Sequence, residues 1–134
     1  MWNMNLQGFH HLTLTVTNIR RSRKFYTEVL GLKVVSEISS TRVIVGNDDT
    51  FLGLTEPTDP SRAVENDRFN ENRVGLDHLS FGVDSRDDLE RAAAWFDEHN
   101  VRHAEISEIP SYGIVVMMFW DPDNIQLELT APSE

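Results

Sequence analysis

His11-Leu12-Thr13-Leu14-Thr15-Val16 is the stretch that decides the fold, because the same pattern returns as His78-Leu79-Ser80-Phe81-Gly82-Val83 in the second half of the chain. The two halves also end alike, with Leu52-Gly53-Leu54-Thr55 in the first and Leu127-Glu128-Leu129-Thr130 in the second. An internal repeat has to be recognised before any other feature, because missing it leads to the wrong fold. The sequence therefore predicts two copies of one strand–helix–strand pattern.

The opening segment of each copy alternates between polar and apolar side chains. Over residues 9–16, His11 and Thr13 fall on one face and leucines on the other, and His78 and Ser80 repeat this arrangement in the second copy. A period of two predicts a strand with one buried face. Both histidines are therefore expected on the polar face, beside small hydroxyl side chains that would suit the wall of a cavity.

Helix signals follow each opening strand. Asn18 predicts an N-cap before an apolar stripe at helical spacing, and Gly31 predicts the C-terminal cap. In the second copy Ser85 or Asp84 predicts the N-cap, and Asn100 predicts the end of the helix. The later apolar segments predict three strands after each helix, at residues 33–39, 42–45 and 50–55 and at residues 102–106, 114–120 and 125–130.

The order β-α-β-β-β, found twice, predicts an α+β fold. We expect one domain over residues 1–134, with a first module at about 8–57, a connection at 58–75 and a second module at about 76–132. The connection is long and polar, and such loops in compact domains are often functional or mobile. The sequence leaves open whether the two modules pair within one chain or between two chains.

Composition excludes several classes of function. With 134 residues, 40% of them hydrophobic, the chain can form its own core. Its net charge of −10 argues against nucleic acid or an anionic membrane as a partner, and the absence of cysteine excludes thiolate chemistry. The N-terminus lacks a signal-peptide pattern, and the longest apolar run, 114–120, is far below the ~20 residues of a membrane helix. We expect a soluble cytoplasmic protein.

Three residues suggest a metal site. Two copies folded face to face would bring His11, His78 and Glu128 toward one centre, and two imidazoles with one carboxylate form a recognised metal-binding set. Glu128 shares a strand face with Gln126, and a carboxylate in mid-strand on a cavity face is costly without a partner. On these residues alone the alternative stays open, in which Glu128 is a solvated strand residue and the histidines have no special role.

The chain resembles the vicinal oxygen chelate superfamily, which includes glyoxalase I, extradiol dioxygenases and bleomycin-resistance proteins. The resemblance rests on Phe9 to Val16, on Phe25-Tyr26 and Leu30-Gly31 in the first helix, and on Asp121-Pro122-Asp123-Asn124 leading to Glu128. It implies two βαβββ modules forming a cup-shaped mixed sheet around a divalent metal. It also implies His11, His78 and Glu128 as metal ligands, whereas His10 does not match the motif.

One departure from the family pattern bears on the reaction. Glyoxalase I and its isomerase relatives carry an acidic ligand where this chain has Gly53, and glycine can neither bind a metal nor move a proton. The remaining two histidines and one carboxylate are typical of non-heme Fe(II) oxygenases with open coordination positions. We therefore expect one divalent metal per chain, with Fe2+ or Mn2+ favoured and Zn2+ or Ni2+ possible.

The residues around the expected metal indicate the ligand. Extradiol dioxygenases carry a tyrosine on the strand that enters the last hairpin; here this position is apolar, and Tyr112 is the candidate for its acid–base role. No lysine or arginine follows Arg102, so a strongly anionic substrate would lack a late cationic clamp. The expected pocket residues are Thr13, Phe51, Ser80, Met117, Met118, Trp120 and Gln126.

Two classes of function follow from the resemblance and these departures. The first is a metal-dependent enzyme, dioxygenase-like or lyase/isomerase-like, that acts on a small oxygenated, weakly charged or aromatic compound bound through adjacent oxygens. The alternative is a protein of the bleomycin-resistance type that sequesters a drug or natural product. Such binders commonly lack the metal ligands, so the presence of all three favours the enzyme. A homodimer is expected, because the modules leave strand edges that invite pairing.

Overall fold

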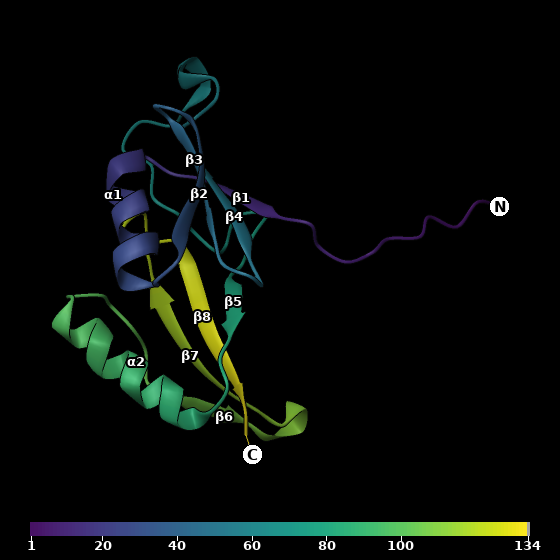
Figure 1. Ribbon diagram of the computed structural model, residues 1–134, viewed down its shortest axis with the longest axis vertical. Helices are drawn as coiled ribbons and strands as arrows, with labels where there is room; N and C mark the ends of the chain where they lie inside the picture. The colour runs from purple at the N-terminus through teal and green to yellow at the C-terminus, as the bar shows by residue number, and fades with distance from the viewer. Residues whose placement is uncertain (134) are drawn as a thin grey trace. The chain divides into compact units, whose positions relative to one another are not determined.

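The computed structural model describes residues 1–133, which divide between two compact units, one up to Val64 and one from Glu65. Each unit contains a four-stranded mixed sheet and one main helix (Figure 1), so the predicted α+β class is confirmed. The single-domain organisation and the module boundaries stay predictions. Within residues 1–133, no helix combines the length and the apolar character needed to cross a membrane.

The first unit has the strand order β1-β4-β3-β2. Strand β1 runs parallel to β4, and the other neighbours are antiparallel. Helix α1 lies beside this sheet (Figure 1) and contacts β3 and β4, and the buried residues Tyr26, Val45 and Leu54 contribute to the core. The elements are β1 (Leu12–Thr15), α1 (Ile19–Lys24), the π-helical turn η1 (Phe25–Val29), β2 (Lys33–Ser39), β3 (Arg42–Gly46), β4 (Phe51–Thr55) and the short 3-10 helix η2 (Pro60–Arg62).

The second unit repeats this topology with the strand order β5-β8-β7-β6. Strand β5 runs parallel to β8, and the long β7–β8 hairpin is antiparallel. Helix α2 packs on β7 and β8, where the rings of Phe96 and Phe119 stack with their centroids 4.6 Å apart. The elements are β5 (Leu79–Gly82), α2 (Arg86–Glu98), β6 (Ser107–Ile109), the 3-10 helix η3 (Pro110–Tyr112), β7 (Ile114–Trp120) and β8 (Gln126–Pro132).

Local signals explain where the helices begin and end. Asn18 accepts a hydrogen bond from the backbone N–H of Arg21 and caps α1, as predicted. Ser85 caps α2 in a reciprocal capping box with Asp88, which satisfies backbone donors that have no partner inside the helix. Gly31 has a φ of +76°, a conformation that glycine adopts at little cost, and this ends the first helical segment as predicted.

The turn between β7 and β8 is fixed by its first residue. The Oδ1 atom of Asp121 accepts hydrogen bonds from the backbone N–H groups of Asp123 and Ile125, each at 2.8 Å. Asn124 adopts a φ of 66°, which asparagine tolerates better than most residues. The turn predicted from these residues is therefore present, and it sets the register of β8.

Two predicted strands differ from the structure. The strand at residues 102–106 is wrong, because this segment makes one isolated bridge, between His103 and Phe119, and the edge strand β6 begins at Ser107. The imidazole Nδ1 of His103 lies 2.8 Å from the carbonyl oxygen of Ala104, so a side chain occupies a group that a ladder would use. The opening strand is also shorter than the predicted 9–16, since β1 begins at Leu12.

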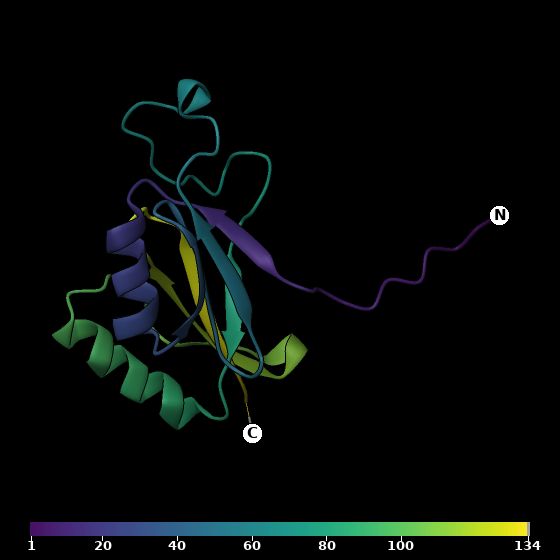
Figure 2. The same cartoon turned by 45° about the horizontal axis from the view of Figure 1, so that its top comes forward.

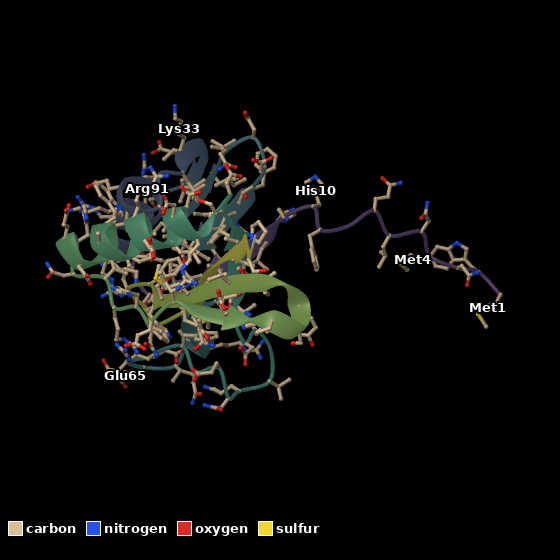
Figure 3. All side chains as sticks on the ribbon, turned by 90° about the horizontal axis from the view of Figure 1, so that it is seen from below. Met1, Met4, His10, Lys33, Glu65 and Arg91 are labelled. Atoms are coloured by element: carbon tan, nitrogen blue, oxygen red, sulfur yellow. The ribbon has the colours of Figure 1, made fainter. Side chains whose placement is uncertain are left out.

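The segment before β1 runs away from the first sheet (Figure 2). Figure 3 labels Met1, Met4 and His10 along it. The large apolar side chains of this segment are exposed, with Trp2 at 77% and Leu6 at 78% of their full accessibility.

Candidate metal centre

The two sheets place equivalent residues in equivalent register. In the second unit Ser80 of β5 pairs with Glu128 of β8, and in the first unit Thr13 of β1 pairs with Gly53 of β4. Gly53 therefore occupies the position in its own sheet that Glu128 occupies in the other. This register supports the internal repeat at the level of individual residues, and it shows that the first copy lacks a carboxylate there.

The second unit brings two of the expected metal ligands together. His78, directly before β5, has its Nε2 atom 3.7 Å from the Oε1 atom of Glu128. The His78 side chain is 40% exposed and that of Glu128 is 13% exposed. Protein imidazole nitrogen and carboxylate oxygen bind divalent cations at about 2.0–2.2 Å, so a cation fits between two atoms at this separation. The donor set of this pair therefore suits a divalent metal.

Glu128 is held in place by hydroxyl groups on the same sheet face. Thr130 Oγ1 donates a hydrogen bond to Glu128 Oε1 at 3.0 Å, and Ser80 Oγ lies 2.5 Å from Thr130 Oγ1. These contacts offset part of the cost of keeping a carboxylate in a partly buried position. They link β5 and β8 below the His78–Glu128 pair.

The other ring nitrogen of His78 has a carboxylate neighbour. Nδ1 of His78 lies 2.7 Å from Oδ1 of Asp77. The side-chain amide of Gln126 donates to the backbone oxygen of Asp77 at 3.1 Å and to its Oδ1 at 3.3 Å. Asp77, His78, Gln126 and Glu128 therefore form one connected polar cluster within the second unit.

His11, the third expected ligand, lies in the first unit directly before β1. Its side chain is exposed, and its Nδ1 lies 2.8 Å from Nδ1 of His10, so one of the two rings donates to the other. Within residues 1–133, the structure shows no group of three or more His, Asp or Glu side chains arranged to hold a metal. Of the three expected ligands, the structure thus brings two close together, His78 and Glu128.

Gly53 has no space for a side chain. A Cβ on Gly53 would lie 2.6 Å from Oγ1 of Thr13, which is closer than real Cβ atoms approach, and 3.1 Å from its Cγ2, which is tighter than most Cβ contacts. The β-branched side chain of Thr13 therefore fills the space that a carboxylate at residue 53 would need. With Thr13 as its strand partner, residue 53 is best suited to glycine.

The expected pocket residues fall on different faces of their sheets. Met118 pairs with Glu128, and Trp120 pairs with Gln126, so both belong to the face that carries the polar cluster. Met117 alternates to the opposite face and is fully buried, so it belongs to the core. Phe51 is half exposed at the start of β4, one residue from the Leu12–Leu52 pair.

Tyr112, the candidate acid–base residue, lies in η3 and is 79% exposed. Its catalytic role stays a prediction. Arg102, the last lysine or arginine of the chain, makes its contacts with other residues. The guanidinium of Arg102 stacks 3.9 Å from the centroid of the Trp120 ring, and its Nη2 donates to Asn124 Oδ1 at 2.5 Å.

Two residues around His78 and Glu128 were not predicted from the sequence, namely Asp77 of the polar cluster and Thr130, which donates to Glu128. Asp77 directly precedes His78, and Thr130 follows Glu128 at a spacing of two on the same strand face. The strand alternation that identified Glu128 and Gln126 could also have identified Thr130. Asp77 gives a weaker signal, because it lies outside the strand and its role depends on the orientation of one side chain.

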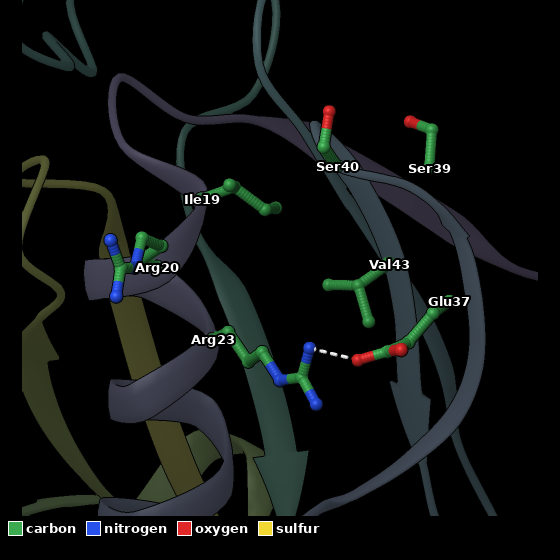
Figure 4. Close-up of a pocket in the computed structure, with 7 residues that line it drawn as sticks. All are labelled: Ile19, Arg20, Arg23, Glu37, Ser39, Ser40 and Val43. Carbon is green, nitrogen blue, oxygen red and sulfur yellow. Dashed lines mark hydrogen bonds and ion pairs between the residues drawn. The ribbon is translucent and has the colours of Figure 1, made fainter.

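A cavity of about 350 Å³ lies in the first unit, between α1 and the β2–β3 hairpin (Figure 4). Figure 4 shows Arg23 reaching from α1 toward Glu37 of β2, with which it forms an ion pair. The cavity lies on the sheet face that carries Val43. Thr13 and Gly53 lie on the opposite face of the same sheet. Its lining residues are Ile19, Arg20, Arg23, Glu37, Ser39, Ser40 and Val43.

Comparison with known proteins identifies the family. The family model of the Glyoxalase/Bleomycin resistance protein/Dioxygenase superfamily matches residues 8–129, and the chain belongs to this superfamily. The resemblance inferred from the sequence is thereby confirmed.

Individual relatives cover nearly the whole chain. The chain is 29% identical to the uncharacterized protein YaeR of Escherichia coli (strain K12) over 133 residues, which cover 94% of this chain and 97% of YaeR. It is 27% identical to the metallothiol transferase FosB of Staphylococcus saprophyticus over 124 residues, covering 92% of this chain and 76% of FosB. The solved structure of a glyoxylase/bleomycin resistance protein/dioxygenase domain from Frankia sp. EAN1pec matches with a TM-score of 0.81 at 30% identity, covering 96% of this chain and 93% of that one.

Proposed function

We propose that this protein is a metal-dependent enzyme of the superfamily, dioxygenase-like or lyase/isomerase-like, with one divalent metal per chain. The observation that carries the proposal is the approach of His78 Nε2 to Glu128 Oε1, 3.7 Å apart on a sheet face lined by hydroxyl groups. His11 occupies the equivalent place before β1 and is proposed as the third ligand. Two imidazoles with one carboxylate favour Fe2+ or Mn2+.

The chain's own groups would prepare the site in defined ways. When bound, the metal would act as a Lewis acid and as a template for adjacent oxygen atoms of a substrate. Thr130 and Ser80 keep the Glu128 carboxylate oriented. Because Gly53 has no side chain that could serve as a fourth protein ligand, a bound metal would keep positions free for oxygen atoms of a substrate.

The surroundings of Glu128 favour a weakly charged or aromatic ligand. Met118 and Trp120 supply apolar and aromatic surface on its face, while Thr13, Ser80 and Gln126 are proposed to supply polar contacts. Arg102 is committed to Trp120 and Asn124, and the protein carries a net charge of −10. Both features disfavour a phosphonate or a dicarboxylate.

Two alternatives share this fold. The first is sequestration of a drug or natural product, as in bleomycin-resistance proteins. The close approach of His78 and Glu128 favours metal chemistry over sequestration alone. The second is thiol transfer, which the 27% identity to a metallothiol transferase supports. The contacts that engage Arg102 and the net charge of −10 favour an enzyme that acts on a weakly charged substrate over this transferase.

Competition titrations on the metal-loaded protein test the ligand class. We expect a catechol-like compound, with two adjacent oxygens on an aromatic ring, to bind more tightly than a fosfomycin-like phosphonate. A resorcinol-like compound, with the same composition but separated oxygens, is the matched control and should bind weakly. Tighter binding of the phosphonate would contradict the proposal and support the transferase.

A further inference from the structure

The environment of His78 distinguishes its two ring nitrogens. Nδ1 lies 2.7 Å from a carboxylate oxygen of Asp77, whereas Nε2 lies 3.7 Å from the carboxylate of Glu128, beyond hydrogen-bond distance. A neutral imidazole carries one N–H donor and one acceptor nitrogen, and an ionised carboxylate only accepts. In the neutral ring the short contact therefore requires the proton on Nδ1, which leaves Nε2, the nitrogen nearer to Glu128, as the acceptor.

Asp77 is itself fixed by the neighbouring strand. Its side chain is 68% exposed, so packing alone does not orient it. Gln126 on β8 donates from one amide nitrogen to both the backbone oxygen and Oδ1 of Asp77. Since Gln126 stands two residues before Glu128, one strand supplies both the carboxylate near Nε2 and the amide that holds the partner of Nδ1.

The first copy lacks this asymmetry. There His10 stands where Asp77 stands in the second copy, and its Nδ1 lies 2.8 Å from Nδ1 of His11. Two neutral imidazoles can exchange the roles of donor and acceptor, so this contact does not fix a tautomer. In the second copy, the carboxylate of Asp77 can only accept, and it therefore fixes the tautomer of a neutral His78 ring.

We propose that Asp77, held by Gln126, is a positioning residue that fixes His78 in its Nδ1–H tautomer and so presents Nε2, beside Glu128, to a divalent cation. The inference rests on the proposed metal function and names the groups that prepare one ligand. Partners that orient a metal-binding histidine in this way typically change metal affinity by about 10–100-fold when they are replaced.

The test combines a tautomer measurement with a metal titration. Long-range ¹H–¹⁵N correlation spectra of the metal-free protein, at a pH where the His78 ring is neutral, should show a protonated Nδ1 and a bare Nε2. In Asp77→Ala, Nδ1 of His78 loses its acceptor, so the spectrum should shift toward Nε2–H. The Zn2+ dissociation constant, measured against a chromophoric chelator, should rise by about 10–100-fold.

Further variants separate positioning from charge and folding. Gln126→Met keeps the size of the side chain and removes its donors, so it should raise the Zn2+ dissociation constant in the same direction by a smaller factor. Asp87→Asn removes the same charge from an exposed position on α2 and should change neither measurement. Circular dichroism spectra should be the same for all variants.

The outcomes distinguish this inference from the proposed function. An Nε2–H tautomer in the wild-type protein, or unchanged spectra and Zn2+ affinity in Asp77→Ala, would overturn the role of Asp77. If the wild-type protein shows the Nδ1–H tautomer, Asp77→Ala loses it and neither protein binds Zn2+, the tautomer assignment stands and the metal function falls.

Discussion

Thr13 and Gly53 face each other across the parallel β1–β4 pair, and a Cβ on Gly53 would lie 2.6 Å from the hydroxyl oxygen of Thr13. The corresponding pair in the second unit is Ser80 and Glu128. The two copies thus share one register and differ in chemistry, because one carries a carboxylate and the other has its space filled by threonine. This difference sets the ligand count that we propose for the metal.

Glyoxalase-type isomerisation should be absent or feeble. The first copy has no carboxylate at residue 53 that could bind the metal and move a proton between carbon atoms. The measurement is the conversion of the methylglyoxal–glutathione hemithioacetal by the pure, metal-loaded protein. Rapid turnover would show that another group moves the proton, and it would remove the argument from Gly53.

Gly53→Ala should destabilise the protein by about 1–3 kcal/mol, as overpacking in a filled space does. Gly82→Ala is the matched control, since a Cβ at this strand glycine meets no atom within 4 Å, and it should be neutral or slightly stabilising. Urea unfolding curves of the two variants measure the difference. Combining Gly53→Ala with Thr13→Ala should recover part of the loss, because the two residues are in contact. Equal stability of Gly53→Ala and the wild type would contradict the close approach.

Stability should fall as the pH rises above neutrality, because of His103. Burial alone would lower the pKa of His103, but its hydrogen bond to the Ala104 carbonyl and the hydrogen bond and negative charge of Asp97 raise the pKa above its ordinary value. A raised pKa stabilises the fold fully below about pH 6.5, the value in an unfolded chain, and this contribution is lost as the pH rises through the folded pKa.

Urea unfolding at a series of pH values measures this contribution. His103→Gln should flatten the fall in the free energy of unfolding above about pH 6.5. Asp97→Asn should reduce this fall with pH. Asp87→Asn, which removes the same charge elsewhere on α2, should leave the fall unchanged. A wild-type slope in His103→Gln would show that His103 does not supply the effect.

The protein should be a homodimer. The edge strands are β1 and β2 in the first sheet and β5 and β6 in the second. The edge strand β2 carries exposed apolar side chains, among them Val35 and Ile38, which soluble monomers usually avoid on a strand edge. Light scattering across micromolar concentrations should give about twice the chain mass of 15.4 kDa. A mass of one chain throughout this range would refute the prediction.

Much of the fold could be predicted because its signals are local. The bounds of β2 and β7 agree with the predicted 33–39 and 114–120, and Asn18 and Ser85 cap their helices through contacts within one turn. The strand predicted at 102–106 failed because its β-forming pattern competes with a side-chain hydrogen bond from His103 that periodicity does not reveal.

The candidate site was less predictable than the fold. The internal repeat and strand alternation identified His78, Glu128 and Gln126 as residues of one polar face, and the structure brings His78 and Glu128 together. Asp77 was missed because its role depends on a contact between β8 and the residue before β5, which no sequence period encodes. The place of His11 relative to this pair stays a prediction.

Metal content is the measurement that tests the proposed centre most directly. The protein, purified anaerobically without chelator, should contain about one divalent metal per chain. His78→Ala and Glu128→Ala should each lose most of this metal, while His99→Ala, which removes an exposed imidazole at the end of α2, should keep it. Folded His78→Ala and Glu128→Ala proteins that retain the full metal content would contradict the assignment of these two ligands.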